Sequence, residues 1–325
     1  MTRPICLVTG ATGAVGPAVV RALAAGREIR TLSRRPPAAG LFDTTVTSFI
    51  GDVSDKNAVR QAARGTDVIV HLAALLHVTN PPPERRAEYE RVNVGGTAAV
   101  LDAAKTEGVG RVVFVSTIAV YGRSAGGMLD ETSPARPDSF YGETKLAAEG
   151  LALDARRGDG SPLATVLRPA AVYGTRVKGN YERLVRAIAC RRFVPVGPGA
   201  NRRTLVFEED LASAIALAAT HADAAGRIYN VTDGGTHRMR EIIAEIRAAL
   251  GRGVLRWHVP VAPVRAALAI GGIVKPGLPH ALDTYLEDVA VKGERIGDEL
   301  GFRPLVGLAE GWSRAIAGMR QDGLL

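Results

Sequence analysis

The chain contains 325 residues, of which 46 % are hydrophobic, so it is long enough for one large domain or two fused lobes. The net charge is +8 at pH 7, but the excess arginine is scattered and only 5 % of residues are aromatic, which argues against a nucleic-acid-binding protein. Cys6 and Cys190 lie far apart, no signal peptide precedes the first strand and no apolar run reaches ~18 residues, so we expect a cytoplasmic protein without a disulfide framework or a membrane span.

The first predicted element is a buried parallel strand at residues 5–8, followed at once by Gly10-Ala-Thr-Gly13-Ala-Val-Gly16 and a helix. Gly10 permits a tight turn, Gly13 lets the backbone approach a pyrophosphate, and Gly16 lets the helix pack close to the sheet. Backbone N–H groups and the helix dipole favour the anionic phosphates. We therefore predict a dinucleotide site at this loop, which also includes Thr12, Ala14 and Val15.

The second predicted strand, at residues 28–33, carries the cofactor preference. Its last residue normally meets the adenosine ribose, where an acidic side chain suits NAD and a nearby Arg suits the extra phosphate of NADP. This chain has Ser33 and then Arg34, without an acid, so we predict NADP rather than NAD. The alternative is that Arg34 and Arg35 form a solvated pair before two prolines.

Asp52 and Val53 follow the third predicted strand, at residues 46–50. The Asp52 carboxylate could accept a hydrogen bond from the adenine amine of the cofactor. It could equally cap the helix predicted at residues 55–64. We place both residues in the cofactor site and leave the two roles of Asp52 open.

Further strands are predicted at residues 67–72, 111–116, 163–167 and 228–231, with helices at 84–107 and 141–157 between them. This alternation predicts an α/β fold with a parallel sheet covered by helices on both faces. Beyond residue 170, glycine and proline interrupt the pattern. We predict a cofactor domain of residues 1–170 plus about 201–236, and a smaller substrate lobe of 171–200 plus about 237–325. We expect the apolar stretch 261–274 to be a helix of that lobe, with a membrane-surface or apolar-substrate role as the alternative.

Tyr141 and Lys145 are spaced by four residues, which places them on one face of a helix about one turn apart. A phenol with a pKa near ~10 is a poor base at neutral pH, but an ammonium beside it favours the phenolate and lowers that pKa. The pair is therefore a plausible proton shuttle for a hydroxyl/carbonyl interconversion. Ser116 and Thr117, at the end of the predicted strand 111–116, are the other candidate catalytic residues.

These motifs together resemble the extended short-chain dehydrogenase/reductase family, the group of NAD(P)-dependent nucleotide-sugar epimerases, dehydratases and ketoreductases. The glycine loop matches the family's cofactor loop, and Tyr141-Gly-Glu-Thr-Lys145 matches its catalytic dyad. The other ordered matches are Val70-His71-Leu-Ala73-Ala74, Val92-Asn93-Val-Gly-Gly-Thr97, Val115-Ser116-Thr117, Leu167-Arg168-Pro169-Ala-Ala-Val-Tyr173-Gly174 and the segment from Arg203 to Ala212. The resemblance implies a Rossmann-type doubly wound sheet with a smaller C-terminal substrate lobe.

The resemblance also implies a role for each matching residue. Tyr141 exchanges a proton with the substrate, Lys145 lowers the pKa of Tyr141 and holds the nicotinamide ribose, and Thr117 hydrogen-bonds the same substrate oxygen, with Ser116 as the weaker candidate. Arg203 pairs with a substrate diphosphate, or is a solvated loop residue beside Arg202. Further cofactor contacts are Leu72, Ala73, Ala74, Asn93, Pro169 and Val172, further substrate contacts are Asn180 and Lys275, and no metal is expected. The family also implies a homodimer formed through the helices that hold Asn93 and Tyr141.

The leading hypothesis is an enzyme that acts on a nucleotide-diphosphate sugar, such as a UDP-sugar, by hydride transfer at the sugar C4. Epimerisation, which would recycle bound NAD, and 4-keto reduction both remain open, whereas Ile118-Ala119 after Thr117 replaces the acidic pair of a dehydratase. The alternatives are an NADP-dependent reductase or dehydrogenase of an apolar sterol or phenolic alcohol, and a dinucleotide-sensing regulator without catalysis.

Overall fold

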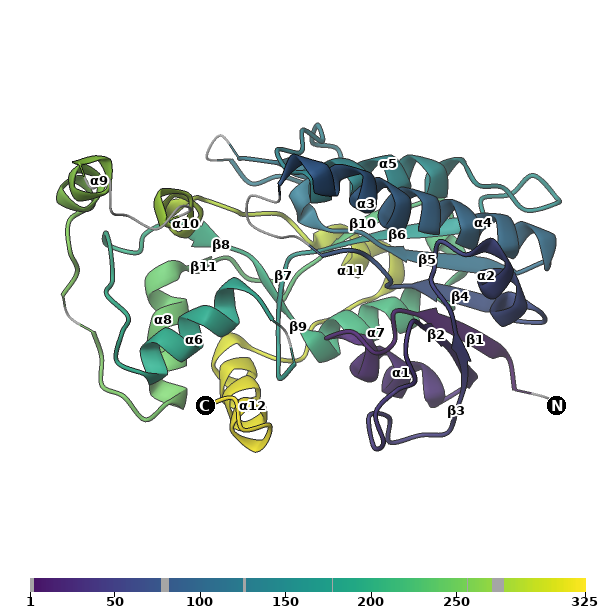
Figure 1. The fold of residues 1–325 in the computed structure, drawn as a ribbon, viewed down its shortest axis with the longest axis horizontal. Coiled ribbons are helices and arrows are strands. Elements are labelled where there is room, and N and C mark those ends of the chain that lie inside the picture. The colour runs from purple at the N-terminus through teal and green to yellow at the C-terminus, as the bar shows by residue number, and fades with distance from the viewer. Residues whose placement is uncertain (1–2, 77–81, 125–126, 177, 256, 271–277) are drawn as a thin grey trace.

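A computed structural model describes residues 3–76, 82–124, 127–176, 178–255, 257–270 and 278–325. Its centre is a parallel sheet with the strand order β10-β6-β5-β4-β1-β2-β3 (Figure 1). This order has the doubly wound, Rossmann-type topology, so the predicted fold class is confirmed. The strands are β1 (Ile5–Thr9), β2 (Glu28–Ser33), β3 (Val46–Ile50), β4 (Val68–His71), β5 (Arg111–Val115), β6 (Ala164–Pro169) and β10 (Ile228–Val231).

The chain reverses its direction of winding at β1, which pairs with β2 on one side and with β4 on the other. In sheets of this kind, ligands bind outside the carboxyl ends of the strands at such a switch point. The glycine loop follows β1 directly, so it lies at this crevice. The sheet topology therefore supports the predicted position of the cofactor site.

Two apolar layers cover the two faces of the sheet. Helices α1 (Gly16–Ala24) and α7 (Glu208–Ala218) pack against one face through buried residues that include Val19, Val20 and Ile215. Helices α2 (Lys56–Ala63), α4 (Gly96–Thr106) and α5 (Phe140–Asp154) contribute buried residues to the other layer. The inner strands β1, β4, β5 and β6 are thus shielded from water, as their nearly continuous apolar sequences require, whereas the edge strand β3 is largely exposed.

The helix predicted at residues 84–107 is interrupted in the structure. It consists of a 3-10 turn η1 (Pro83–Arg85), a short α-helix α3 (Arg86–Tyr89), a π-helical turn η2 (Glu90–Gly95) and α4. The sequence pattern does not reveal the interruption, because a π turn shifts the register of the apolar face without a proline to mark it. The π turn contains Asn93, whose buried side chain is engaged with neighbouring elements.

The remaining elements build a third apolar cluster beside the sheet, around Tyr173, Ile242 and Trp312. The sequence analysis missed two small strand pairs, β7 (Ala171–Tyr173) with β9 (Leu205–Phe207), and β8 (Arg202–Arg203) with β11 (His237–Arg238). The other helical elements are η3 (Ile118–Tyr121), α6 (Asn180–Ala189), η4 (Ala222–Ala224), α8 (Met239–Ala249), α9 (Val261–Ile270), α10 (Leu278–Leu286), α11 (Glu294–Leu300) and α12 (Leu308–Gln321). Within the described ranges, no helix is long and apolar enough to cross a membrane.

Helix α11 packs differently from its neighbours in sequence. Its residues Ile296 and Leu300 belong to the apolar layer of the sheet, although they fall in the predicted substrate lobe. The division into a cofactor domain and a substrate lobe stays a prediction.

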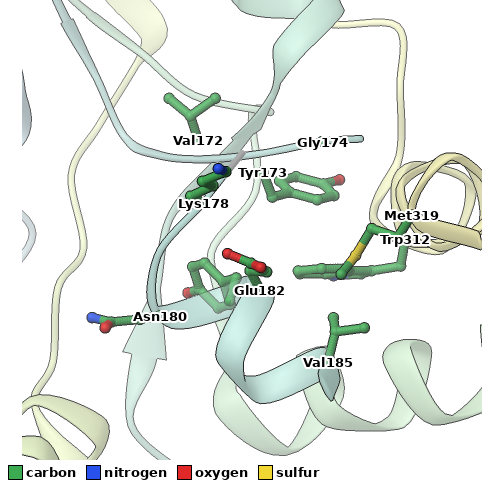
Figure 2. Close-up of a pocket in the computed structure, with 10 residues that line it drawn as sticks. Val172, Tyr173, Gly174, Lys178, Asn180, Glu182, Val185, Trp312 and Met319 are labelled. Atoms are coloured by element: carbon green, nitrogen blue, oxygen red, sulfur yellow. The ribbon is translucent and has the colours of Figure 1, made fainter. Parts of the chain in front are cut away.

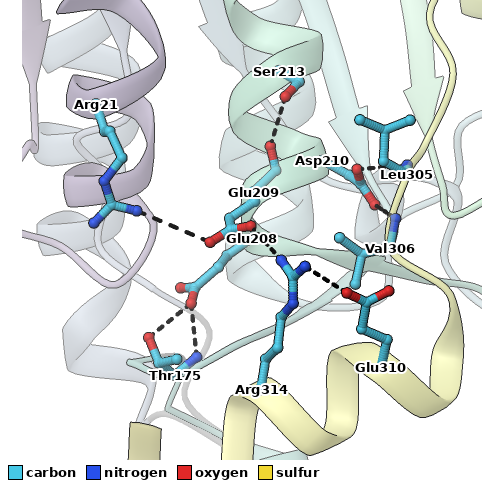
Figure 3. A network of polar contacts seen from close by, with 10 residues as sticks. All are labelled: Arg21, Thr175, Glu208, Glu209, Asp210, Ser213, Leu305, Val306, Glu310 and Arg314. Atoms are coloured by element: carbon cyan, nitrogen blue, oxygen red, sulfur yellow. Dashed lines mark hydrogen bonds and ion pairs between the residues drawn. The ribbon is translucent and has the colours of Figure 1, made fainter.

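A polar network at the start of α7 connects the sheet to the C-terminal helix (Figure 3). Glu208 accepts hydrogen bonds from the Thr175 backbone and hydroxyl at 2.8 and 2.7 Å. Arg314 of α12 pairs with Glu209 at 2.9 Å, and Asp210 accepts from the backbone N–H groups of Leu305 and Val306. Three acids in the first turn also suit the positive end of the α7 dipole. The network therefore fixes the loop after β7 relative to α12.

One ion pair is almost completely buried. Arg168 at the end of β6 donates to Glu149 of α5 at 2.5, 3.0 and 3.1 Å, and its guanidinium lies 4.8 Å from the centre of the Tyr121 ring. The side chains are 5 % and 1 % exposed. Since each charge is desolvated, either one alone would be far less tolerable than the pair.

We expect Arg168→Met to lower the free energy of unfolding by about 3 kcal/mol, because it leaves the Glu149 carboxylate buried without its partner. Urea denaturation measures this change. Arg60→Met is the matched control, since Arg60 forms an ion pair with Glu107 but its own side chain is 62 % exposed, and we expect that control to cost less than about 1 kcal/mol. Equal losses of unfolding free energy in the two variants would contradict the description of Arg168 and Glu149 as a buried ion pair.

Candidate functional site

The glycine loop leaves no room for side chains at two of its positions. Gly10 has a φ of +75°, and a Cβ built on it would lie 2.6 Å from the Ala73 nitrogen. A Cβ on Gly16 would lie 1.9 Å from the Ala11 carbonyl oxygen. Gly13 is exposed at the crevice, and its own N–H donates to the Gly10 carbonyl at 2.9 Å. The structure thus brings Ala73 against the glycine loop and keeps the Gly13 side of the loop open.

The predicted ribose end of the site is formed by β2 and β3. The Ser33 hydroxyl donates to the Arg35 carbonyl at 2.8 Å, and Arg34 is exposed. Burial would raise the pKa of Asp52, but the hydrogen bonds from Ser54 and the charges of Arg91 and Arg34 together lower it. The preference for NADP over NAD stays a prediction that rests on Ser33 and Arg34.

The proposal that Asp52 caps the following helix is wrong. The cap of α2 is Asp55, whose carboxylate accepts from the N–H groups of Asn57 and Ala58 at 2.9 and 3.3 Å. Asp52 instead accepts from the backbone and hydroxyl of Ser54, at 2.9 and 2.7 Å. The adjacent Val53 is buried under α4, where it would meet a Cβ on Gly96 at 2.7 Å.

The candidate catalytic residues meet where β5 ends and α5 begins. Ser139 caps α5 and places Tyr141 and Lys145 in its first two turns. The Lys145 ammonium donates to the Val115 carbonyl at 2.7 Å and lies 4.1 Å from the centre of the Phe114 ring. Thr117 follows Val115 by two residues and is hydrogen-bonded with the Tyr141 side chain. Tyr141, Lys145 and Thr117 are therefore brought together as predicted.

The expected lowering of the Tyr141 pKa by Lys145 is not what the structure shows. Burial raises the pKa of Tyr141 to about 12, and the hydrogen bond with Thr117 offsets this only in part. Burial also lowers the pKa of Lys145 to about 7, against an opposing effect of Glu149. The reason is that desolvation dominates at Tyr141, while the Lys145 ammonium is directed to the Val115 carbonyl. At neutral pH the phenol is a proton donor in this environment.

Ser116 differs from its neighbour Thr117. Its side chain is 3 % exposed, and its hydroxyl has no hydrogen-bond partner among the residues that the structure describes. A buried hydroxyl without a hydrogen-bond partner is energetically costly. The Ser116 hydroxyl would therefore be stabilised by a hydrogen bond to a ligand atom. Ser116 therefore fits a binding role beside Lys145 better than a purely structural one.

A chain of hydrogen bonds runs beneath this site. The Thr9 hydroxyl lies 2.7 Å from Nδ1 of His71, whose Nε2 lies 3.0 Å from the Thr97 hydroxyl. Thr97 donates to the Asn93 carbonyl at 2.7 Å. Since the one hydroxyl hydrogen of Thr97 is used there, His71 Nε2 must donate. Burial together with the Lys145 charge lowers the pKa of His71 to about 3, so the imidazole is neutral and its Nδ1 accepts from the Thr9 hydroxyl.

Asn93 continues the chain to the catalytic helix. Its amide donates to the Thr144 hydroxyl at 3.0 Å, and its carbonyl oxygen accepts from the Leu75 N–H at 2.7 Å. Thr144 is the residue before Lys145. Asn93 therefore also fixes the segment after β4 that contains Leu72, Ala73 and Ala74. The sequence analysis gave no role to His71, Thr97 or Thr144. The available signal was a polar His71 near the end of a predicted buried strand.

A second group of predicted residues surrounds a cavity of about 50 Å³ between β7, α6 and α12 (Figure 2). Val172 and Asn180 line it together with Tyr181 and Glu182, and Trp312 forms its floor on the α12 side. Pro169, at the buried end of β6, leads into the same segment. Val172 and Asn180 thus lie at one cavity, as far as the described side chains show.

Arg203 is not a solvated loop residue. It lies in β8 and donates to the carbonyls of Thr284 and Tyr285, the latter at 3.4 Å. Its Nε is buried and has no hydrogen-bond partner in the described part of the chain. Burial raises the pKa of Tyr181 to about 12, and the Arg203 charge acts in the opposite direction. Lys275 lies outside the described residues.

The residues present fit a dinucleotide. The glycine loop offers backbone N–H groups at the switch point, and Cβ atoms at Gly10 and Gly16 would clash with the backbone of Ala73 and Ala11 that shapes this loop. Lys145 and the Ser116 hydroxyl, which has no partner among the described residues, lie at the strand end where the nicotinamide half would be held. The polar groups at the two ends of the crevice thus match the two halves of the cofactor.

The comparisons with known proteins agree with this geometry. The model of the NAD dependent epimerase/dehydratase family matches residues 6–232. The chain is 31 % identical to N-acetyl-alpha-D-glucosaminyl-diphospho-ditrans,octacis-undecaprenol 4-epimerase of Escherichia coli O157:H7, over 78 % of this chain and 75 % of that protein. It is 29 % identical to UDP-glucose 4-epimerase of Vibrio cholerae, over 95 % of this chain and 93 % of that protein.

A solved structure gives the same picture. MoeE5 in complex with UDP-glucuronic acid and NAD matches this chain with a TM-score of 0.77 and 28 % identity, covering 98 % of this chain and 99 % of that one. The similarity spans both the sheet and the elements after residue 170. The expectation of a dinucleotide-binding enzyme of this type is confirmed.

We expect His71 to make the fold less stable in acid. The unfolded chain binds a proton on this side chain below about pH 6.5, whereas the folded chain does so only below about pH 3. The free energy of unfolding therefore falls as the pH decreases from 6.5, by up to about 1.4 kcal/mol per pH unit. Urea denaturation of the wild type and of His71→Gln between these pH values should show a flatter dependence in the variant.

The matched control is His258→Gln, because His258 is exposed. We expect this variant to retain the wild-type pH dependence. An unchanged slope in His71→Gln would show that His71 is not the neutral, buried group described above.

Proposed function

The chain belongs to the NAD dependent epimerase/dehydratase family, and on this premise we propose that it acts on a nucleotide-diphosphate sugar by hydride transfer at the sugar C4. The observation that carries the reaction type is the meeting of Tyr141, Thr117 and Lys145 at the end of β5. The nucleotide-sugar relatives support the substrate class. The choice of C4 as the reacting carbon is the finer part of this proposal, and it rests on the roles assigned to the residues below.

The chain's own residues divide the chemistry among them. When bound, the dinucleotide supplies the hydride donor and acceptor. Tyr141 donates its phenolic proton to a sugar ketone or accepts it back from a hydroxyl, and Thr117 orients the same oxygen. Lys145 would hold the nicotinamide ribose, and Ser116 would offer a hydroxyl to a bound group. Leu72, Ala73, Ala74, Pro169 and Val172 would line the cofactor.

Arg203 is the proposed diphosphate ligand. Its buried Nε has no hydrogen-bond partner within the described ranges, and a charged donor of this kind gains most from an anion. Asn180 lines the cavity beside Tyr181, so it is the proposed sugar contact. Together they would hold the diphosphate and the sugar on the β7 side of Tyr141.

Epimerisation and 4-keto reduction are both compatible with this arrangement. An elimination is less suited, because Ile118 is buried and Ala119 carries no acid after Thr117. Reduction of an apolar alcohol has less support, since the described part of the apolar stretch, α9, does not line the cavity in Figure 2. A homodimer through the helices of Asn93 and Tyr141 and a cytoplasmic location stay predictions.

The diphosphate has a second candidate carrier. The relative from Escherichia coli O157:H7 is named for a sugar that is linked through a diphosphate to undecaprenol. Arg203 would bind the diphosphate of a polyprenol-linked sugar in the same way as that of a nucleotide sugar. The observation that favours this candidate is the exposed apolar face described in the next section.

We expect Tyr141→Phe to reduce kcat by about 10²-fold or more, because it removes the proton that the substrate oxygen exchanges. NAD binding should be retained, since the ring stays in place. Tyr229→Phe is the matched control, because Tyr229 lies on the edge strand β10 and its hydroxyl donates to Glu299 of α11. Turnover of UDP-hexoses and their 4-keto derivatives, followed by product chromatography, measures the effect. Wild-type activity in Tyr141→Phe would contradict the proposed mechanism.

We expect Arg203→Met to raise the KM for the sugar diphosphate by about 10- to 100-fold, the cost of losing a charged hydrogen bond. Titration with UDP should show the same loss of affinity, while NAD affinity stays the same. Arg320→Met, an exposed arginine of α12, serves as the control. Equal UDP affinity in wild type and Arg203→Met would remove Arg203 from the site.

A further inference from the structure

The end of the molecule farthest from the sheet exposes apolar side chains that a soluble surface would normally bury. Val254 is 78 % exposed, Trp257 is 56 % exposed and Val194 is 52 % exposed. Helix α9, with the sequence Val-Ala-Pro-Val-Arg-Ala-Ala-Leu-Ala-Ile, begins four residues after Trp257. Residues 262, 263, 266 and 267 of this helix are exposed as well. We name this set, together with Arg191 and Arg192, the outer face.

Backbone pairing brings the two segments of the outer face together. Val196 and Val259 form a parallel bridge, with hydrogen bonds from the Val259 N–H to the Pro195 carbonyl at 2.9 Å and from the Gly197 N–H to the Val259 carbonyl at 2.8 Å. This register places Val194 on the same edge as Trp257. The exposed apolar side chains are therefore one surface and not isolated residues.

The outer face projects from the body of the protein. Figure 1 shows α9 at the left edge, beyond α10 and far from the sheet. An ion pair of 2.9 Å between Arg265 and Asp283 connects α9 to α10. No other element forms more than a slight contact with α9 among the described residues. The helix is thus free to meet a large, flat partner.

The charge of the outer face has one sign. Residues 190–200 and 250–268 contain no Asp or Glu, and both Arg191 and Arg192 are exposed. Arginines beside Trp, Val and Leu are the chemistry of a surface that lies at the headgroup level of an anionic bilayer. The net charge of +8, for which the nucleotide-sugar site gives only part of an explanation, acts in the same direction.

A second copy of the chain fits this face less well. A two-fold interface places the same patch on both sides, so the arginines of one copy would face those of the other without an acidic partner. Trp257 also combines an apolar body with a polar N–H, which suits the boundary between lipid and water. We propose that the outer face docks on an anionic lipid bilayer surface.

The outer face adjoins the proposed diphosphate site. Arg203 donates to the carbonyls of Thr284 and Tyr285, which belong to the last turn of α10. Val261 of α9 and Leu286 of α10 meet at Gly197, where a Cβ would lie 3.0 and 3.4 Å from them. Resting on the proposed function, this proximity lets a docked protein receive a sugar diphosphate whose lipid stays in the bilayer.

Sedimentation with vesicles tests the docking directly. We expect the full chain to bind vesicles of phosphatidylglycerol and phosphatidylcholine, to bind pure phosphatidylcholine weakly, and to lose affinity as salt is added. The double variant Val254→Ser/Trp257→Ser should bind at least about tenfold less, because two apolar side chains no longer enter the interface. Leu305→Ser is the matched control, since Leu305 is 82 % exposed elsewhere on the surface.

The following results would overturn the docking proposal. Absence of binding to anionic vesicles, or equal binding by the double variant, would show that the outer face does not dock on lipid. A shift of the double variant from dimer to monomer without vesicle binding would assign the face to a second copy. NAD binding and the unfolding temperature, expected to be unchanged, verify that the variants fold. UDP-sugar turnover is measured separately, so the docking and the proposed function can fail independently.

Discussion

The structure depends on the hydrogen-bond chain that begins at Thr9 and ends at Thr144. It passes through His71, Thr97 and Asn93, and each link joins a different element: β1, β4, α4, η2 and α5. All of its members are nearly inaccessible to water, so each hydrogen bond is strong and a missing one would be costly. The hydrogen-bond chain therefore holds the glycine loop and the catalytic helix in a fixed relative position. His71 stays neutral in this chain, because burial and the charge of Lys145 lower its pKa.

Charged side chains are also buried near this hydrogen-bond chain, and they differ in how their charges are compensated. Arg168 and Glu149 neutralise one another in a bidentate pair behind α5. Lys145 donates to a carbonyl and lies over an aromatic ring, and burial lowers its pKa despite the opposing effect of Glu149. Arg203 keeps a buried nitrogen without a partner in the part of the chain that the structure describes. The charges that lack full partners are the ones that the proposed function assigns to ligands.

The elements after residue 170 connect the chemistry to the surface. The loop after β7 is fixed by Glu208, while α10 is tied to Arg203 through its last carbonyls. Helix α9 is joined to α10 by one exposed ion pair. The proposed order of contacts is thus cofactor, sugar, diphosphate and bilayer, from the switch point of the sheet to the outer face.

The sequence by itself determined the parallel sheet, the glycine loop and the positions of Tyr141, Lys145 and Thr117. These features arise from short-range patterns: apolar runs of strand length, glycines at fixed offsets, and a spacing of four on one helix. Only the tertiary structure decided the π turn at Asn93, the cap at Asp55, the raised pKa of Tyr141, the hydrogen bonds of His71 and the place of Arg203 in β8. Those outcomes depend on burial and on partners distant in sequence, such as Thr9 with His71 or Arg203 with Thr284, which no local pattern encodes.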